Sequence, residues 1–334
     1  MNSPKQAVVC RVLGTSRQAL HQYQKRQRIL EQRLLAAESA LLVLRRDHHR
    51  LGLKKAYGMI QPPGIGRDRF VRKMTLWGHA LAIHRSHIRT TRSGSSRYPN
   101  LIKGLVINDI NRIWQSDTTY FRLSERFAYL TFIIDVYSRL IVGYCVSLTL
   151  AGSANVDALR MALQTRKHSD LSELIFHSDG ATQYRYGPFV ECLRAHGISS
   201  SMCDVALDNA YAEKVNDVIK NEYLAAYSIT SIRQLRYRVS RAVYNYNEVR
   251  HHGQLPVKLA PYAYESYLEQ CSMDQRPALM IKDGQTKQRE YELWAVQNLL
   301  NSSATWVSEG AKQILPCFVQ LDQPKENGQL VLAL

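Results

Sequence analysis

Three β-rich segments follow one another between residues 113 and 148, and they constrain the fold more than any other feature of the sequence. Residues 113–123, 128–136 and 140–148 are rich in β-branched and aromatic residues, and short polar breaks separate them. Such spacing is typical of strands in an antiparallel meander. We therefore expect a sheet at the centre of the chain.

Helices and strands are expected to alternate after this meander. The expected elements are helices at 155–166 and 186–196, strands at 174–177 and 198–202, and closing helices at 213–227 and 232–246. A meander followed by alternating helices and strands predicts an α/β domain with a mixed sheet and helices on its faces.

The sequence upstream of residue 101 predicts an all-α region. A turn at 14–16 separates a short helix at 4–13 from a long helix that runs from residue 17 to about 46, as in a helix-turn-helix. A second helical pair is expected at 51–60 and 67–77, joined by a breaker that contains Pro and Gly. The apolar stripe of the long helix either packs on its own domain or pairs with a partner helix, and packing is favoured.

Four regions are expected along the chain. They are residues 1–50 with the first helix-turn-helix and the long helix, 51–100 with the second basic helix-turn-helix and a linker, 101–265 with the mixed sheet, and 266–334, a tail of unassigned fold. Within the tail we expect a helix at 288–300 and a hairpin at 313–334.

The excess positive charge lies in the first hundred residues. The net charge of +16 comes from 44 Lys and Arg against 28 Asp and Glu. Residues 1–100 hold 20 basic and 4 acidic residues, a difference of 16, whereas residues 101–334 hold 24 of each. A basic module attached to a neutral one is typical of proteins that bind a polyanion such as DNA.

The helix at 67–77 is the best candidate for a recognition helix. Phe70, Met74 and Trp77 share one of its faces, which leaves the basic side chains available to phosphates or base edges. These DNA-binding candidates are Arg67, Arg69, Arg72 and Lys73.

Cysteine usage and hydropathy predict a cytoplasmic protein. The six cysteines are scattered without metal-binding spacing, and neither a signal peptide nor a membrane span is evident. His79, His84 and His87 have no cysteine partner nearby, so a zinc site is not expected.

Three acidic residues indicate catalysis. Asp117 lies in the first β-rich segment, Asp179 follows the fourth expected strand, and Glu213 opens a helix. Phosphodiester chemistry needs charge neutralised on the attacking and leaving oxygens, which two divalent ions can do. Because Mg²⁺ prefers carboxylate oxygens, a small set of Asp and Glu suffices beside DNA.

A series of motifs resembles one family closely. In chain order they are Trp114-Gln-Ser-Asp-Thr-Thr-Tyr120, Asp135-Val-Tyr-Ser-Arg139, His177-Ser-Asp-Gly-Ala-Thr-Gln-Tyr184, Ser201-Met202, Asp208-Asn-Ala-Tyr-Ala-Glu213, Lys220-Asn-Glu222 and Tyr244-Asn-Tyr-Asn-Glu-Val-Arg-His251. Together they resemble the second-frame, catalytic transposases of bacterial insertion sequences of family three. This family belongs to the superfamily of DDE transposases and retroviral integrases, and the resemblance implies an RNase H-like catalytic core.

The resemblance implies roles for particular residues. It makes Asp117, Asp179 and Glu213 the catalytic residues and the ligands of two Mg²⁺ or Mn²⁺ ions. Gln183, Tyr184 and Lys220 are further candidates for DNA contact, and Lys220 is expected on the same helical face as Glu213. One departure is that 33 residues separate Asp179 from Glu213, two fewer than is usual in the family.

Other acidic residues in the motifs are expected to be structural. Asp135 is expected to cap a turn or to pair with an Arg such as Arg139. Asp208 and Asn209 precede the helix of Glu213, where an N-cap role is the ordinary explanation. Glu222 lies roughly opposite Glu213 on the helical wheel and is a poor third ligand.

The function implied is metal-dependent nicking and strand transfer at insertion-sequence ends. The expected partners are double-stranded DNA, as element ends and target, further copies of this chain in a homo-oligomer, and a first-frame protein. An RNase H-type nuclease would share the acids but has less need of two basic helical modules. A transposase-derived DNA-binding regulator without catalysis would predict a broken triad.

Overall fold

The computed structural model describes residues 10, 12, 14–81, 98–124, 126–204 and 206–281. Most of the expected helix at 4–13, most of the linker before residue 101, and the expected tail helix and hairpin lie outside these residues. Within the described part of the chain, no helix is both long and apolar enough to cross a membrane.

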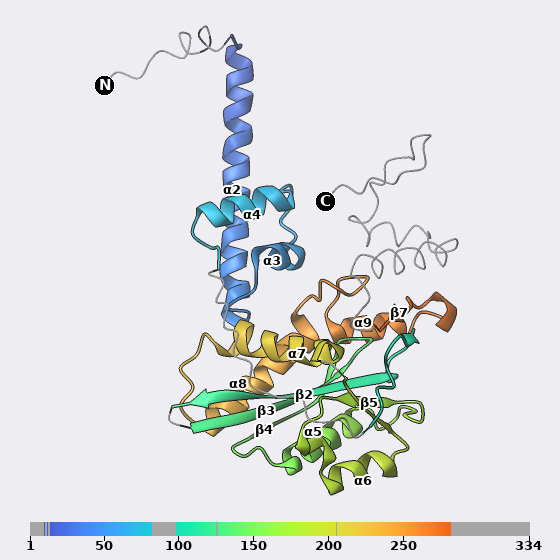
Figure 1. The fold of residues 1–334 in the computed structure, drawn as a ribbon. Coiled ribbons are helices and arrows are strands. Elements are labelled where there is room, and N and C mark those ends of the chain that lie inside the picture. The colour runs from blue at the N-terminus through green and yellow to red at the C-terminus, as the bar shows by residue number, and fades with distance from the viewer. Residues whose placement is uncertain are drawn as a thin grey trace.

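The N-terminal region is helical, as predicted. Helix α2 (Arg17–Asp47) begins at Ser16, whose hydroxyl accepts a hydrogen bond from the Ala19 N–H at 3.0 Å. Helices α3 (Leu53–Ile60) and α4 (Arg67–Leu76) pack against it, while its first half stands away from the rest of the molecule (Figure 1). One hydrophobic cluster unites the three helices and includes Leu34, Leu41, Ile65, Phe70 and Met74. The second half of the apolar stripe of α2 therefore packs within the chain, as favoured, whereas Ile29 is 40% exposed.

A five-stranded mixed sheet forms the centre of the molecule. Its strands are β2 (Ile113–Leu123), β3 (Arg126–Asp135), β4 (Ile141–Ser147), β5 (Ile175–Ser178) and β6 (Ser199–Met202). The spatial order is β4-β3-β2-β5-β6, with β2, β3 and β4 antiparallel and with β5 and β6 parallel to β2. The predicted mixed sheet is confirmed, and its strand order is RNase H-like.

Helices cover both faces of this sheet (Figure 1). Helices α5 (Gly152–Thr165) and α6 (Gly187–Ala195) lie on one face, and α7 (Ala210–Asp217) and α8 (Ile232–Tyr244) lie on the other. Alternate side chains of β3 supply the two cores, since Leu130, Phe132 and Ile134 pack toward α7 and α8 whereas Ile133 packs toward α5.

Two of the closing helices change type before they end. Helix α7 continues as the π-helical segment η3 (Val218–Leu224), and α8 continues as the π-helical segment η4 (Asn245–Val249). The sequence predicts uninterrupted helices here. Because a π turn is wider than an α turn, each residue after Asp217 rotates by a smaller angle about the helix axis than α-helical spacing assumes.

Short elements complete the fold. They are the 3₁₀ turns η1 (Thr182–Arg185), η2 (Ala206–Asn209) and η5 (Met273–Gln275), helix α9 (Pro261–Leu268), and the two-stranded antiparallel sheet of β1 (Val106–Ile107) and β7 (Leu279–Met280). None of these short elements is among the elements expected from the sequence. Helix α9 has Pro261 in its first turn, a position where the missing N–H costs no hydrogen bond, so the sequence held a signal for it.

Candidate active site

The fold brings the three predicted catalytic carboxylates into one neighbourhood. Strands β2 and β5 are parallel with Ser116 opposite Ser178, so Asp117 and Asp179 occupy the next position on neighbouring chain segments. Glu213 lies in the first turn of α7, which packs on β2 and β3. Residues from three elements, separated by up to 96 positions in the sequence, therefore face a common region.

Burial raises the pKa of each carboxyl group, and the charge of Asp179 raises the pKa of Asp117 and Glu213 further. The pKa of Asp117 rises from 3.8 to about 7, first because of burial and then because of the charge on Asp179. Burial also raises the pKa of Asp179 and, together with the charge of Asp179, the pKa of Glu213. Such a cluster of like charges is stabilised by either protons or cations.

The donor set suits a hard divalent cation, although its atoms are not gathered around one point. Carboxylate oxygens are the ligands that Mg²⁺ and Mn²⁺ prefer. Among the described residues, no group of three or more His, Cys, Asp or Glu side chains is arranged to hold a metal ion. The three carboxylates interact electrostatically but do not converge, as expected of like charges that face one another.

Hydrogen bonds orient two of the carboxylates. The Oδ1 of Asp117 accepts from the Thr118 N–H at 2.8 Å, and its Oδ2 accepts from the side-chain amide of Asn216 at 2.8 Å. Asn216 lies on α7 three residues after Glu213, so this bond ties the helix of one candidate ligand to the carboxylate of another. Asp179 accepts from the Ala181 N–H at 3.2 Å.

Gln115 connects the central strand to the start of α7. Its side chain is fully buried, and its Oε1 accepts from the N–H groups of Tyr211 at 3.1 Å and Ala212 at 3.4 Å. Its Nε2 donates to the Asp208 carbonyl at 2.8 Å. Our sequence interpretation missed this positioning role, for which an amide at a buried strand position two residues before Asp117 was the available signal.

The expected N-cap of α7 is wrong in its detail. Asn209 is the N-cap residue, but its side chain makes no capping bond and instead donates to the Ser116 carbonyl at 3.0 Å. The carboxylate of Asp208 accepts from the Asn100 side chain and from the Asp204 N–H. Gln115, from another element, accepts the helical N–H groups that a capping residue would otherwise bind.

The other acidic motif residues are engaged away from the carboxylate cluster. Asp135 is fully buried and accepts from the N–H groups of Asn111, Tyr137 and Ser138. Glu222 forms a bidentate pair with Arg250 and also accepts from Lys55. Asp135 therefore caps the turn that follows β3, one of the two roles expected of it, whereas the ion pairs of Glu222 were not expected from the sequence.

The candidates for DNA contact near the cluster differ in accessibility. Lys220 is half-buried, donates to the Thr119 hydroxyl at 3.1 Å and lies over the Tyr120 ring, so it reaches β2 close to Asp117. Gln183 is also half-buried. Tyr184 is a correction, because it is only 2% exposed and its hydroxyl bonds the Ser116 hydroxyl at 2.9 Å. Tyr184 packs in the core and offers no surface to DNA.

The basic candidates on α4 are accessible. Arg67, Arg69 and Arg72 are exposed and Lys73 is half-buried, while Phe70 and Met74 are fully buried on the opposite side. The predicted division of this helix into an apolar and a basic face is therefore correct, except that Trp77 is 37% exposed.

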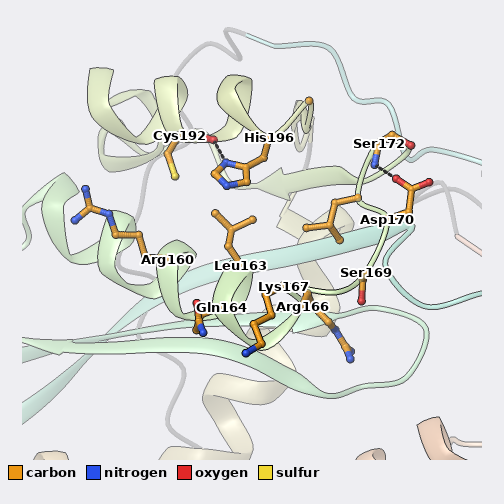
Figure 2. Close-up of a pocket in the computed structure, with 12 residues that line it drawn as sticks. Arg160, Leu163, Gln164, Arg166, Lys167, Ser169, Asp170, Ser172, Cys192 and His196 are labelled. Atoms are coloured by element: carbon orange, nitrogen blue, oxygen red, sulfur yellow. Dashed lines mark hydrogen bonds between the residues drawn. The ribbon is translucent and has the colours of Figure 1, made fainter.

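A large surface cavity lies away from the carboxylates. It has a volume of about 780 Å³ and lies between the ends of α5 and α6 and the loop that follows α5 (Figure 2). Arg160, Lys167, Asp170 and His196 contribute to its lining. Because α5 and α6 cover the sheet face opposite α7, this cavity contains none of the candidate catalytic residues.

Two family models, both described as integrase core domain, match the chain. The first covers residues 108–206 and the second covers residues 198–258. Together the two matches span residues 108–258. All three candidate carboxylates lie within this matched region.

Relatives of the integrase core are insertion-sequence transposases, which confirms the resemblance carried by the motifs. The chain is 39% identical over 119 residues to a putative transposase of IS986/IS6110 from Mycobacterium tuberculosis, covering 34% of this chain and 43% of the relative. It is 29% identical over 180 residues to the IS629 transposase of Shigella sonnei, covering 52% and 60%. It is 31% identical over 146 residues to transposase InsF of IS3A from Escherichia coli, covering 43% and 50%. The matches therefore span about half the length of these relatives.

Solved structures with a similar fold are viral integrases. The HTLV-2 integrase catalytic core domain in complex with magnesium is 16% identical, with a TM-score of 0.37, and the match covers 49% of this chain and 97% of that one. A chain of the simian T-cell lymphotropic virus intasome in complex with PP2A regulatory subunit B56 gamma is 14% identical, with a TM-score of 0.44, over 66% of this chain and 70% of that one.

Proposed function

We propose that this protein is a DDE transposase that nicks and joins DNA at the ends of an insertion sequence. The observation that carries the proposal is the electrostatic interaction of Asp117, Asp179 and Glu213, from β2, the segment after β5 and α7, within the region that matches the integrase core models. The raised pKa of all three groups supports it, because perturbed carboxyl groups gathered in one place are typical of functional sites.

Asp117, Asp179 and Glu213 would hold divalent cations, two Mg²⁺ or Mn²⁺ ions in our proposal. When bound, such ions activate the attacking oxygen and neutralise the charge that develops on the phosphate. The HTLV-2 core domain with a similar fold was solved with magnesium.

The surrounding residues would position these ligands and the substrate. Gln115 and Asn216 would keep α7, and with it Glu213, in register with β2. The ammonium group of Lys220, next to Asp117, would hold a DNA phosphate beside the carboxylates.

The proposed partners follow from this reaction. Double-stranded DNA is the substrate, as element ends and as target, and a homo-oligomer would bring two ends together. A first-frame partner protein and a cytoplasmic location also remain part of the proposal.

The deciding experiment is strand transfer on labelled element-end DNA with Mg²⁺. We expect joined products from the wild type and from Asp208→Asn, whose carboxylate accepts hydrogen bonds from the neighbouring loop residues Asn100 and Asp204, and none from Glu213→Gln. If cleavage occurs without joining, the nuclease alternative replaces the proposal. If the wild type binds DNA but neither nicks nor joins it, the regulator alternative does.

A further inference from the structure

Helix α8 presents a basic and aromatic face to solvent. Its 13 residues include four arginines and no acidic residue. Leu235, Val239, Ala242 and Val243 are buried toward the sheet. The opposite side, which we call the α8 basic face, consists of the exposed residues Arg233, Arg236, Tyr237, Arg241 and Tyr244.

Aromatic rings arrange the guanidinium groups along this helix. The Arg241 guanidinium lies 5.5 Å from the centre of the Tyr244 ring, and that of Arg238 lies 5.6 Å from the Tyr237 ring. Both rings are more than half exposed, at 59% for Tyr237 and 53% for Tyr244. Exposed rings and planar cations in this arrangement suit contact with a sugar–phosphate backbone.

The end of helix α2 adds positive charge beside α8. Arg238 stacks on the Tyr227 ring at 3.7 Å, and the Tyr227 hydroxyl bonds the His49 ring. Asp47 lies 4.0 Å from Arg241, and exposed Arg46 precedes it in the chain. Asp47 offsets part of the charge of Arg241, but the four arginines of α8 and exposed Arg46 leave this surface with a net positive charge that favours binding of a polyanion.

The α8 basic face lies on the same side of the sheet as the catalytic carboxylates. Helix α8 packs against the π segment η3, which carries Lys220, and Lys220 bonds Thr119 two residues beyond Asp117. The helix is about 20 Å long at 1.5 Å per residue. DNA carries one negative charge for about every 1.7 Å of its axis, so this length faces several phosphates.

We propose that the α8 basic face binds the backbone of a DNA duplex outside the catalytic site and holds the DNA that leads to Asp117. This inference rests on the proposed transposase function. The α8 basic face is separate from the basic face of α4. It would bind DNA through phosphate contacts, which do not depend on the DNA sequence.

The test measures binding of the full chain to a labelled duplex by fluorescence anisotropy, over a series of salt concentrations and in EDTA. We expect the Arg233→Gln/Arg241→Gln double variant to bind roughly tenfold more weakly and to lower the slope of log K against log salt by about 2, or about 0.9 for each phosphate that is no longer neutralised. The matched control is Arg160→Gln/Arg194→Gln, which removes two exposed arginines from α5 and α6 on the opposite face.

Each result decides the proposal. Unchanged binding by the α8 double variant, or an equally large weakening in the control, would overturn it, the latter because net charge alone would then explain the effect. Arg233→Lys/Arg241→Lys should restore the slope, and failure to do so would assign the weaker binding to altered structure. Failure of the proposed function is separate, because the wild type itself would then not nick or join DNA in Mg²⁺.

Discussion

Single amide side chains hold the candidate catalytic residues in place. Gln115 satisfies two helical N–H groups and one carbonyl from a fully buried position, and Asn216 reaches the Asp117 carboxylate. A buried polar group that loses its hydrogen-bond partner destabilises the folded state, because the free-energy cost of removing the group from water is no longer offset. The residues that stabilise the site therefore include these two amides as well as its three acids.

Replacing Gln115 should destabilise the protein. We expect Gln115→Leu to lower the free energy of unfolding by about 1–3 kcal/mol, because the N–H groups of Tyr211 and Ala212 would be left without an acceptor. Chemical denaturation measures this change. Gln164→Leu on the exposed side of α5 is the control and should change stability little. Equal effects of the two variants would contradict a special role for Gln115.

The raised pKa of Asp117 predicts a dependence of stability on pH. The native protein retains a proton up to about pH 7 that the unfolded chain releases near 3.8, so this contribution to stability is complete at low pH and is lost as the pH rises through that window. In EDTA, we expect Asp117→Asn to reduce the decline in unfolding free energy between about pH 4 and about pH 7. Parallel curves for wild type and variant would refute the prediction.

At the level of helices and strands, the sequence predicts regular periodic segments well. The five central strands and helices α2 to α8 lie within a few residues of their expected positions, because each has a clear apolar period or a capping signal. The candidate triad was identified by its motifs. The π segments, the two-residue strands β1 and β7 and the role of Gln115 depend on contacts between distant residues, and local periodicity does not encode these.

Helix α9 is held by a buried ion pair that could be tested directly. Arg166 and Glu265 are each 9% exposed and form a bidentate pair that joins α9 to the end of α5. We expect Glu265→Gln to lower the free energy of unfolding by about 3 kcal/mol, because the buried Arg166 loses its hydrogen-bonded counter-charge and keeps only its interaction with Asp135. Replacing both partners, as Arg166→Met/Glu265→Leu, should recover much of this stability. A double variant less stable than Glu265→Gln would show that the pair itself is strongly stabilising.

At the scale of the whole molecule, polar contacts join the N-terminal helices to the integrase core. Glu222 of η3 binds Lys55 of α3 and Arg250, and the His48 ring bonds the Tyr223 hydroxyl at 3.0 Å. His48, Tyr223 and Arg250 are all buried. The two parts of the molecule are therefore connected by hydrogen bonds and an ion pair.

Removing the charge of Glu222 should loosen this connection. We expect Glu222→Gln to increase amide hydrogen exchange in α3, because Lys55 loses its ion pair and Arg250 keeps an unbalanced charge. Exchange in β2 and β3 should change less. Asp47→Asn is the control, since its contact with Arg241 is solvent-exposed and weak. Unchanged exchange in α3 would mean that the other contacts of the junction, such as the His48–Tyr223 hydrogen bond, hold the helices without this ion pair.

Because α2 is long, a small change of angle at this junction would displace its N-terminal end by a large distance. The helix has 31 residues and measures about 46 Å, and its last turn lies directly above Tyr223 and Glu222. A tilt of about 6° at this base would displace the far end of the rod by roughly 5 Å, more than the spacing of one base pair. The position of the N-terminal end of α2 thus depends on a few contacts at its C-terminal end, where His48 and Arg50 bind Tyr223 and Glu222.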